Sequence, residues 1–262
     1  MQDPSKNPGP PDPDAAAIEG IARRVEEIRA RNELLIERMF EGEKRFRNLA
    51  KAVWKVQEEE RRRLARELHD GIGQTLTALV NQLKRAQPAG AVDRGAEDPL
   101  HIAEIALKDV RELSRLLRPP VLDDIGLKAG LQWLARIMRE QGGLNVVSEW
   151  HGEDARLDPE LETLIFRVAQ EALNNVSKHS GQHEARLTAR RLADRVELEI
   201  ADGGRGFDAA KALSPAVAAS GLGLRGIRDR VELFSGQFTI ESTAGRGTRL
   251  RVVVPLTEGV AR

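Results

Sequence analysis

The sequence predicts an α plus α/β protein, in which an all-helical N-terminal half precedes a C-terminal α/β sandwich. Apolar residues recur at heptad spacing in the first part, two amphipathic helices follow, and beyond Gly126 helix-like and strand-like patterns alternate. These patterns predict a coiled coil, a helical hairpin and a sheet covered by helices. The expected segments are a disordered lead at 1–14, a coiled-coil helix at 15–57, a hairpin at 58–120, an α/β domain at 121–257 and a tail at 258–262.

The composition excludes several classes of protein. Lys plus Arg and Asp plus Glu each number 41 among 262 residues, so no global basic field attracts nucleic acid. Cysteine is absent, which excludes disulfides and thiolate metal sites. No apolar run approaches the roughly 18 residues of a membrane span, and the N-terminus lacks a signal-peptide core. We therefore expect a soluble, cytoplasmic protein with no membrane span and no direct contact with nucleic acid.

The N-terminal helix has a 3.5-residue apolar repeat. Five prolines fall within residues 1–14, and the repeat begins after them, with Asn32 in the seam. The repeat favours a coiled coil, and the alternative is one amphipathic helix that packs back on its own domain. A step of eight residues from Val56 to Leu64 shifts the heptad phase before the next segment. The repeat consists of Ile18, Ile21, Val25, Ile28, Leu35, Met39, Phe46, Leu49, Val53 and Val56.

A histidine lies at the edge of the apolar stripe of the helix predicted over residues 58–83. His69 directly follows Leu68, which belongs to that stripe, so His69 faces outward at the edge of the stripe. Asp70 and Gln74 are four residues apart and share one helical face. The alternative is an ordinary amphipathic helix with a surface histidine. The stripe, which we expect to be buried, consists of Leu64, Leu68, Ile72, Leu76, Leu79 and Leu83.

A second helix completes the hairpin. Residues 87–99 contain prolines and glycines and form a loop, and the helix predicted over 100–117 ends before Pro119 because proline cannot continue it. One apolar face of such a hairpin has no partner within one chain. Two hairpins bury it as a four-helix bundle, so we expect a homodimer.

The C-terminal part predicts a mostly antiparallel sheet with helices on one face. Asp158 and Pro159 are typical of the start of a helix. That helix carries a polar stripe of Glu171, Asn175, Lys178 and His179. The expected helices are 127–140, 159–179 and 223–234, and the expected strands are 144–150, 184–192, 195–201, 237–242 and 247–254.

Three glycine-bearing stretches fall at turns of this domain, DGGRGF at 202–207, GLGLRG at 221–226 and GRGT at 245–248. Glycine lets the backbone approach phosphates closely, and the start of a helix provides amides that bind anions. Taken singly, each stretch is also typical of an ordinary turn, and an aspartate before glycine is a common turn-former.

Two parts of the sequence resemble known families. ELHDGIGQTLTAL at 67–79 resembles the phosphoacceptor helix of two-component sensor histidine kinases of the His-Asp-x-x-x-Gln subfamily, the nitrate-sensor and membrane-fluidity-sensor type. QEALNNVSKH at 170–179 and the three glycine stretches, in that order, resemble the ATP-binding domain shared by histidine kinases, gyrase-type topoisomerases and Hsp90 chaperones. The resemblance covers about 57–257. It implies that 58–120 is a dimerisation and histidine phosphotransfer domain and that 121–257 is a catalytic ATP-binding domain.

The resemblance implies a kinase that phosphorylates His69 from ATP and passes the phosphoryl group to an aspartate on a response-regulator receiver domain, whose output is expected to be a helix-turn-helix. Asp70 is expected to act as general base or to orient the imidazole. Gln74, with Asp70, is expected to position water for dephosphorylation of the regulator. The alternatives are a catalytically silent dimeric scaffold and a non-kinase ATPase of the gyrase or Hsp90 type.

The same resemblance implies the residues that hold ATP and Mg²⁺. Asn175 is expected to ligate the metal with Glu171 one turn before it, because Mg²⁺ prefers oxygen ligands. Asp202 is expected to accept a hydrogen bond from the adenine amino group. The remaining expected nucleotide-binding residues are Lys178 and His179 at the phosphates, Gly204 and Gly206 under the base, Gly221, Gly223 and Arg225 at the end of a lid, and Thr248 beside the base.

Overall fold

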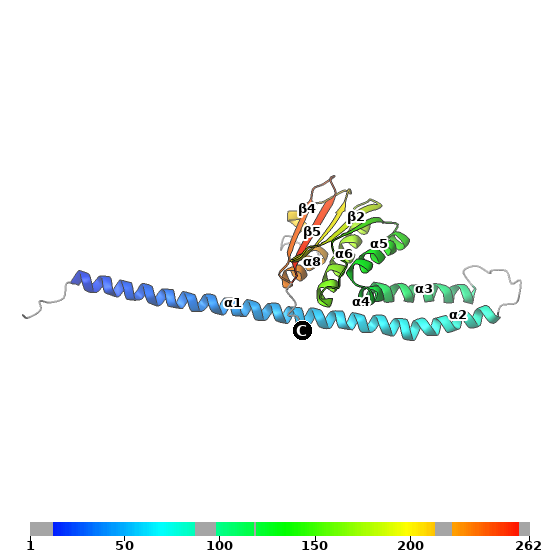
Figure 1. The fold of residues 1–262 in the computed structure, drawn as a ribbon, viewed down its shortest axis with the longest axis horizontal. Helices are drawn as coiled ribbons and strands as arrows, with labels where there is room; N and C mark the ends of the chain where they lie inside the picture. Colours follow the sequence, from blue (N-terminus) through cyan, green and yellow to red (C-terminus); the bar gives the residue numbers. More distant parts are fainter. Residues whose placement is uncertain (1–12, 87–97, 118, 213–221, 257–262) are drawn as a thin grey trace, which may run out of the picture. The chain divides into compact units, whose positions relative to one another are not determined.

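The computed structural model describes residues 13–86, 98–117, 119–212 and 222–256 (Figure 1). The chain divides into two compact units, Met1–Ala52 and Val53–Arg262. The predicted tail at 258–262, most of the predicted lead at 1–14 and Gly221 lie outside the described residues. Over the part that is described, no helix is both long and apolar enough to cross a bilayer.

The first unit is the N-terminal part of helix α1 (Pro13–Glu67), which confirms the predicted long helix. Ion pairs between side chains four residues apart, such as Arg47 with Glu43 at 2.8 Å, support the helix on its surface. Large apolar side chains of the heptad repeat are exposed on the single chain, among them Met39 and Phe46. Such a stripe needs a partner helix, so the coiled coil stays a prediction about the assembled protein.

The second unit begins with the helical hairpin. Helix α1 runs to Glu67, a π-helical turn (η1, Leu68–Gly73) follows, and α2 (Gln74–Ala86) packs against α3 (Pro99–Leu117). Val80, Ala103 and Leu107 form its small core. The prediction of an unbroken α-helix over 58–83 is wrong at η1, because the chain there winds as a π-helix. Just after this turn, the side-chain hydroxyl of Thr75 donates to the carbonyl of Gly71.

The expectation that the apolar stripe is buried also differs from the structure of one chain. Leu64 is 39% exposed, Ile72 is 50% exposed and Leu79 is 42% exposed. A two-helix hairpin can bury only the sides of its helices that face each other. The other side of this stripe remains open until a second hairpin covers it.

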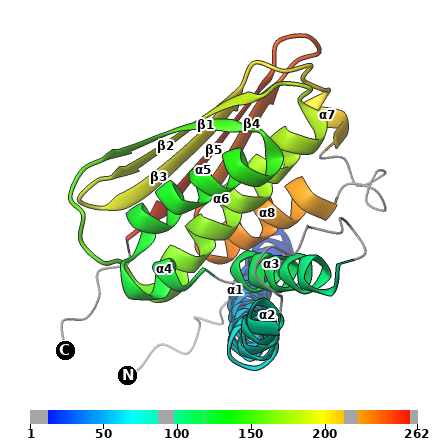
Figure 2. The same cartoon turned by 90° about the vertical axis from the view of Figure 1, so that its right-hand side faces the viewer.

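The α/β domain consists of a five-stranded sheet with its helices on one face (Figure 2). The strand order is β1-β2-β3-β5-β4, and only the β1–β2 pair is parallel, which confirms the predicted mostly antiparallel sheet. The elements are α4 (Pro120–Asp124), α5 (Leu127–Gly142), β1 (Asn145–His151), α6 (Pro159–His179), β2 (Glu184–Arg191), β3 (Arg195–Asp202), α7 (Ala209–Ala212), α8 (Leu222–Leu233), β4 (Gln237–Ser242) and β5 (Thr248–Pro255).

Helix α6 is the central element of the core. The Asp158 carboxylate caps its first turn by accepting from the amides of Glu160 and Leu161 at 2.9 and 3.3 Å, as the sequence predicts. Ile165 and Leu173 are fully buried between the helix and its neighbours. The short helices α4 and α7 are not predicted, since each has fewer residues than a pattern of 3.6 periodicity needs to be recognised.

The uncovered face of the sheet carries a network of opposite charges. Arg195 on β3 and Arg251 on β5 donate to the carboxylate of Glu197 at 2.9 and 3.0 Å. The hydrogen bond from Arg195, followed by that from Arg251, holds the pKa of Glu197 below its ordinary value. Arg195 and Glu197 belong to the same strand, whereas the cross-strand pair of Arg251 with Glu197 favours the observed register of the open face.

A buried ion pair joins the hairpin to the α/β domain within the second unit. Arg167 of α6 donates to one carboxylate oxygen of Glu58 from two nitrogens, at 2.7 and 2.9 Å, and also to the carbonyl of Leu117 at the end of α3. The two side chains are only 4% and 8% exposed. One guanidinium therefore connects three helices.

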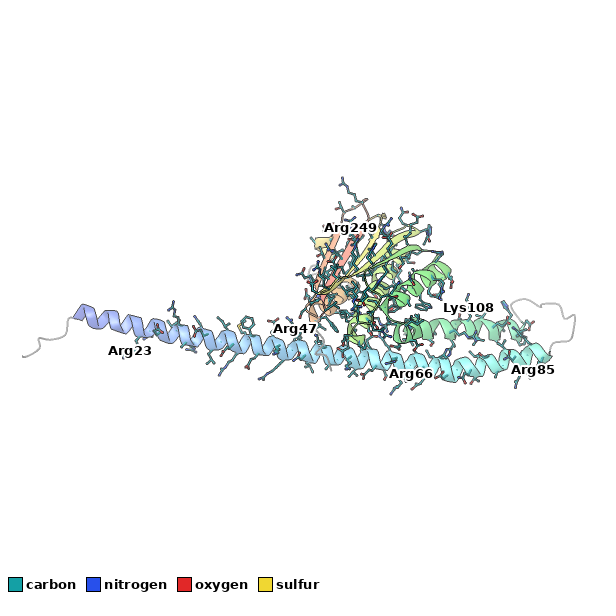
Figure 3. The ribbon with its side chains drawn as sticks, in the orientation of Figure 1. Arg23, Arg47, Arg66, Arg85, Lys108 and Arg249 are labelled. Carbon is teal, nitrogen blue, oxygen red and sulfur yellow. The ribbon has the colours of Figure 1, made fainter. Side chains whose placement is uncertain are left out.

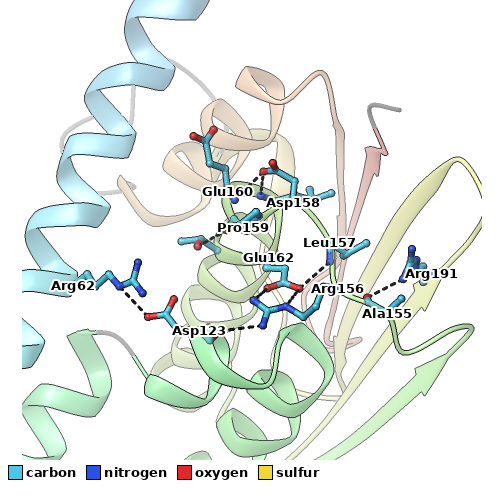
Figure 4. Close-up of polar contacts among 12 residues, drawn as sticks. Arg62, Asp123, Ala155, Arg156, Leu157, Asp158, Pro159, Glu160, Glu162 and Arg191 are labelled. Atoms are coloured by element: carbon cyan, nitrogen blue, oxygen red, sulfur yellow. Dashed lines mark hydrogen bonds and ion pairs between the residues drawn. The ribbon is translucent and has the colours of Figure 1, made fainter. Parts of the chain in front are cut away.

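Two further contacts surround this joint. The ring of Trp54 meets that of Phe234 edge-on, with centroids 5.3 Å apart. Arg62 pairs with the Asp123 carboxylate at 3.1 Å, and Arg156 bridges the Asp123 carbonyl and the buried Glu162 carboxylate (Figure 4). Helix α4 is thereby tied both to α1 and to the start of α6.

Breaking the buried pair should destabilise this unit. We expect Glu58→Gln to lower the free energy of unfolding by about 3 kcal/mol, because it removes the carboxylate charge that pairs with the buried Arg167 guanidinium. Glu59→Gln is the matched control, since Glu59 is exposed and one residue away, and its effect should stay within about 0.5 kcal/mol. Urea unfolding followed by circular dichroism measures both, and equal midpoints for the two variants would contradict the assigned importance of the pair.

Candidate functional site

A cavity of about 380 Å³ opens between α6, the end of β3, the start of α8 and the beginning of β5. It contains a polar end at α6 and an apolar wall made by Ile200, Ile240 and Leu250 of the sheet. An apolar wall beside a few polar groups is typical of a site for a flat ligand such as a nucleobase. The predicted residues that line it are Asn175, His179, Asp202, Gly206, Gly223 and Thr248.

The other predicted nucleotide-binding residues that the structure describes do not line this cavity. Glu171 is one turn before Asn175 on α6, next to Gly223. Lys178 is exposed, Gly204 is buried, and Arg225 is 4.0 Å from the Asp229 carboxylate, and none of these three lines the cavity.

The missing side chain of Gly223 provides the space in front of the polar stripe of α6. A Cβ at this position would lie 2.7 Å from a carboxylate oxygen of Glu171 and 3.8 Å from the side-chain oxygen of Asn175. The amide nitrogen of Asn175 is buried and has no hydrogen-bond partner among the described residues. The Glu171 carboxylate and the side-chain oxygen of Asn175 therefore both lie beside Gly223, and such oxygens suit a hydrated Mg²⁺ ion bound through phosphates, while the Asn175 amide nitrogen can donate to a ligand oxygen.

Those two residues are a sparse ligand set by themselves. Over the described residues, no group of three or more His, Cys, Asp or Glu side chains is placed to hold a metal ion. Mg²⁺ keeps several waters and is commonly held by one or two protein ligands together with substrate phosphates. The residues present fit a metal that arrives with a nucleotide rather than one held permanently.

Asp202 lies where β3 ends, directly opposite Thr248 in the β3–β5 register. One of its carboxylate oxygens accepts from the amide of Gly204 at 2.8 Å, which fixes the side chain at the turn. The hydroxyl of Thr248 lies 3.1 Å from that of Ser242. Ser242 also accepts from the amide of Phe207, so it connects β4 to the loop that follows β3.

Two glycines of the predicted stretches are required by the backbone. Gly206 has a φ of +58°, and a Cβ added there would lie 2.1 Å from the carbonyl oxygen of Thr243. Gly247 has a φ of +77°, and a Cβ added there would lie 2.0 Å from the carbonyl oxygen of Asp202. Side chains do not fit such contacts. Both glycines therefore allow close backbone contact between the loops that follow β3 and β4, and this structural role supplements the predicted one.

Several lining residues are missed by reading the motifs. Ile200, Ile240 and Leu250 are ordinary alternating strand residues, and Val176 belongs to the apolar face of α6. Arg205 also lines the cavity, and its side chain donates to the carbonyl of His179. The only sequence signal for this group is its position next to predicted site residues, since apolar strand residues line cores and pockets alike.

His69 lies in η1 and its side chain is exposed. It lines a groove of about 360 Å³, together with Gln74 of α2 and Arg111 of α3. The remaining lining residues are Gly73, Thr77, Ala78 and Asn81.

Asp70 lines a different groove, with Arg63, Arg66 and Glu67. The sequence predicts Asp70 and Gln74 on one helical face, whereas the structure brings Gln74 together with His69. The π-helical turn is the physical reason, because its wider winding shifts the residues after it relative to α-helical spacing. Among the described residues, the cavity beside α6 and the groove of His69 have no lining residue in common.

Comparison with known proteins identifies two families along the chain. A family model described as "Histidine kinase" matches residues 60–122, and one described as "Histidine kinase-, DNA gyrase B-, and HSP90-like ATPase" matches residues 160–258. The first range contains His69, Asp70 and Gln74, and the second contains the residues that line the cavity.

Two curated relatives are similar over most of the chain. The sensor histidine kinase MctS of Rhizobium johnstonii is 38% identical over 225 residues, which cover 82% of this chain and 47% of that protein. The signal transduction histidine-protein kinase/phosphatase DegS of Bacillus subtilis is 38% identical over 217 residues, which cover 78% of this chain and 55% of that protein. The chain thus spans about half the length of these relatives.

A solved histidine kinase domain, from the blue-light activated histidine kinase of Erythrobacter litoralis EL346, aligns with a TM-score of 0.45 at 16% identity, covering 76% of this chain and 94% of that one. The assignment does not depend on it, because the sequence matches cover the hairpin and the ATPase domain separately. The chain belongs to the sensor histidine kinases, in the subfamily whose phosphoacceptor helix carries the His-Asp-x-x-x-Gln motif.

Proposed function

We propose that this protein is an ATP-dependent protein-histidine kinase that phosphorylates His69 and then transfers the phosphoryl group to a response-regulator aspartate. The observation that carries this proposal is the pairing, in one compact unit, of an exposed histidine on a helical hairpin with a cavity lined by Asn175 and Asp202. A gyrase-type or Hsp90-type ATPase does not require an exposed histidine on a helical hairpin. A catalytically silent scaffold does not require the cavity with Asn175 and Asp202.

In the nucleotide cavity, Asp202 accepts from the adenine amino group, with Thr248 beside it and the apolar wall of Ile200 and Leu250 against the ring. Their positions at the paired ends of β3 and β5 support this assignment. His179 lies on the same wall of the cavity as Asn175 and faces the phosphates. We assign Lys178 and Arg225 to the phosphate side as well, together with Gly221, which lies outside the described residues.

Asn175 and Glu171 hold Mg²⁺ together with the phosphates. The bound ion neutralises charge on the triphosphate and favours in-line transfer. The side-chain oxygens of Asn175 and Glu171, which lie 3.8 and 2.7 Å from the position of a Cβ at Gly223, support this role. Glu171 and Asn175 are also held in place by the buried face of α6, so they need little reorganisation when the ion arrives.

At the acceptor, the unprotonated ring nitrogen of His69 attacks the γ-phosphorus. A nitrogen–phosphorus bond forms, the bond to the bridging oxygen breaks, and ADP leaves with that electron pair. The proton on the second ring nitrogen passes to a base. We assign Asp70 to this proton or to the orientation of the ring, since it is adjacent in sequence and its side chain is exposed.

The partner is a response regulator with a receiver domain and a helix-turn-helix output. The protein acts as a homodimer through the hairpin, whose exposed leucines support a four-helix bundle. The relative from B. subtilis is named as a kinase/phosphatase, and we extend the second activity to this chain. Gln74 positions the hydrolytic water, because its amide can bind a water and a receiver oxygen at once.

Filling the space at Gly223 should weaken nucleotide binding without unfolding the domain. We expect Gly223→Ala to raise the Kd for Mg²⁺-ATP about tenfold or more, because the new methyl group would contact the Glu171 carboxylate, while alanine favours the helix. Gly226→Ala is the matched control on the same helix, since its Cβ would meet only the flexible end of Arg230. Isothermal calorimetry decides, and equal affinities would contradict the placement of the phosphates beside Gly223.

Removing the acceptor should abolish phosphorylation and leave nucleotide binding intact. We expect His69→Gln to lose all acid-labile label from γ-labelled ATP, because glutamine has no nucleophilic nitrogen, while its affinity for ATP stays within about twofold. His101→Gln, an exposed histidine of the same hairpin, should label normally. Label that persisted in His69→Gln would refute the assignment of the acceptor.

Gln74 should separate the two activities. We expect Gln74→Ala to keep autophosphorylation within a few-fold, an effect of about 1 kcal/mol or less, because His69 and Asp70 remain. It should fail to dephosphorylate the phosphorylated regulator, since no amide positions the water. The decay of purified phospho-regulator is the measurement, with Gln82→Ala of the same helix as the control. Undiminished decay with Gln74→Ala would show that the glutamine has no part in hydrolysis.

A further inference from the structure

The groove that contains His69 has one cationic side chain and no carboxylate. Its lining residues offer an imidazole, two side-chain amides, one hydroxyl and the guanidinium of Arg111. Arg111 comes from α3, the second helix of the hairpin, and lies 42 residues after His69 in sequence. A groove of this chemistry favours an anion.

The head of Arg111 is anchored beside the turn that carries His69. Its Nη2 donates to the hydroxyl of Thr77 at 3.3 Å, and that hydroxyl donates to the carbonyl of Gly73 at 2.7 Å. Gly73 is the last residue of η1, so this chain of hydrogen bonds connects the guanidinium to the π-helical turn. The position of the cation is therefore set by the same backbone that presents the histidine.

Arg111 is also available to a ligand. Among the residues whose side chains the structure describes, no carboxylate lies within 4.0 Å of it, whereas Lys84 on the facing helix pairs with Glu104 at 2.8 Å. A guanidinium has five N–H donors in a planar fork, and among the described residues only the hydroxyl of Thr77 accepts from that of Arg111. The fork matches the oxygens of a phosphoryl group.

We propose that Arg111 binds the phosphoryl group at His69, both while it is transferred from ATP and in the resulting phosphohistidine. The inference rests on the proposed function, because it takes His69 as the acceptor. Negative charge is spread over the three equatorial phosphoryl oxygens during transfer, and a guanidinium held beside them stabilises that charge. In the product, the same contact offsets the charge of the phosphoryl group and holds it against the groove.

The test compares Arg111→Gln and Arg111→Lys with Lys108→Gln in the full chain. Lys108 is an exposed cation of the same helix (Figure 3). It shares a second groove with Arg111 but does not line the groove of His69, so its variant removes the same charge without changing that groove. We expect Arg111→Gln to lower the kcat for labelling of His69 about 10- to 100-fold, with the KM for ATP within about twofold. Arg111→Lys should recover part of the rate, and Lys108→Gln should match the unmodified protein.

A second measurement reports on the contact itself. Phosphorus-31 NMR of the phosphorylated protein should give a higher pKa for the phosphoryl group in Arg111→Gln, because a nearby cation favours its doubly charged form. A merely structural role for Arg111 would not move this pKa. Should Arg111→Gln fail to fold, Thr77→Val removes the anchor alone, and it should lower kcat several-fold.

The outcomes separate the two proposals. If the unmodified protein carries no label on His69, the proposed function fails. If His69 is labelled and Arg111→Gln matches Lys108→Gln in both kcat and the phosphoryl pKa, then only the role of Arg111 is overturned. Normal labelling from ATP combined with a loss of transfer to the regulator would also overturn it, because that result assigns Arg111 to the receiver domain.

Discussion

The packing of one face of α6 against the sheet positions the nucleotide cavity. Ile165 and Leu173 are fully buried on that face, and the rotation of the helix is thereby set. Because residues four apart share a face, Glu171 and Asn175 must then lie together at the edge of the cavity. The buried face of α6 alone orients the polar stripe, because any rotation of the helix about its axis that moved Asn175 would expose core side chains.

The same helix connects the cavity to the hairpin. Arg167 is one turn before Glu171, and its buried pair with Glu58 and its bond to Leu117 hold α6 against α1 and α3. Glu58 lies between Val56 and Leu64, where the heptad phase of the sequence shifts by one residue. The buried ion pair therefore lies in the segment where the heptad repeat is interrupted.

Local patterns in the sequence determined most of the fold and much of the site. The N-cap at Asp158, the strand alternation of β2 to β5 and the ends of α3 and α6 follow from capping, periodicity and proline chemistry, which act over a few residues. The same holds for Asn175, Asp202, Gly206 and Gly223, which stand in recognisable motifs and line one cavity. A motif has a local cause, so a single sequence reveals it.

Contacts between distant segments were decided by the tertiary structure alone. The pairing of Glu58 with Arg167 spans 109 residues, and Arg111 meets Thr77 across 34. No periodicity predicts either pair. The π-helical turn at Leu68–Gly73 groups Gln74 with His69 instead of Asp70. By itself, then, the sequence determined the segments and the chemistry they carry. The packing of helices against one another decided which side chains meet, because that choice minimises a free energy summed over the whole unit.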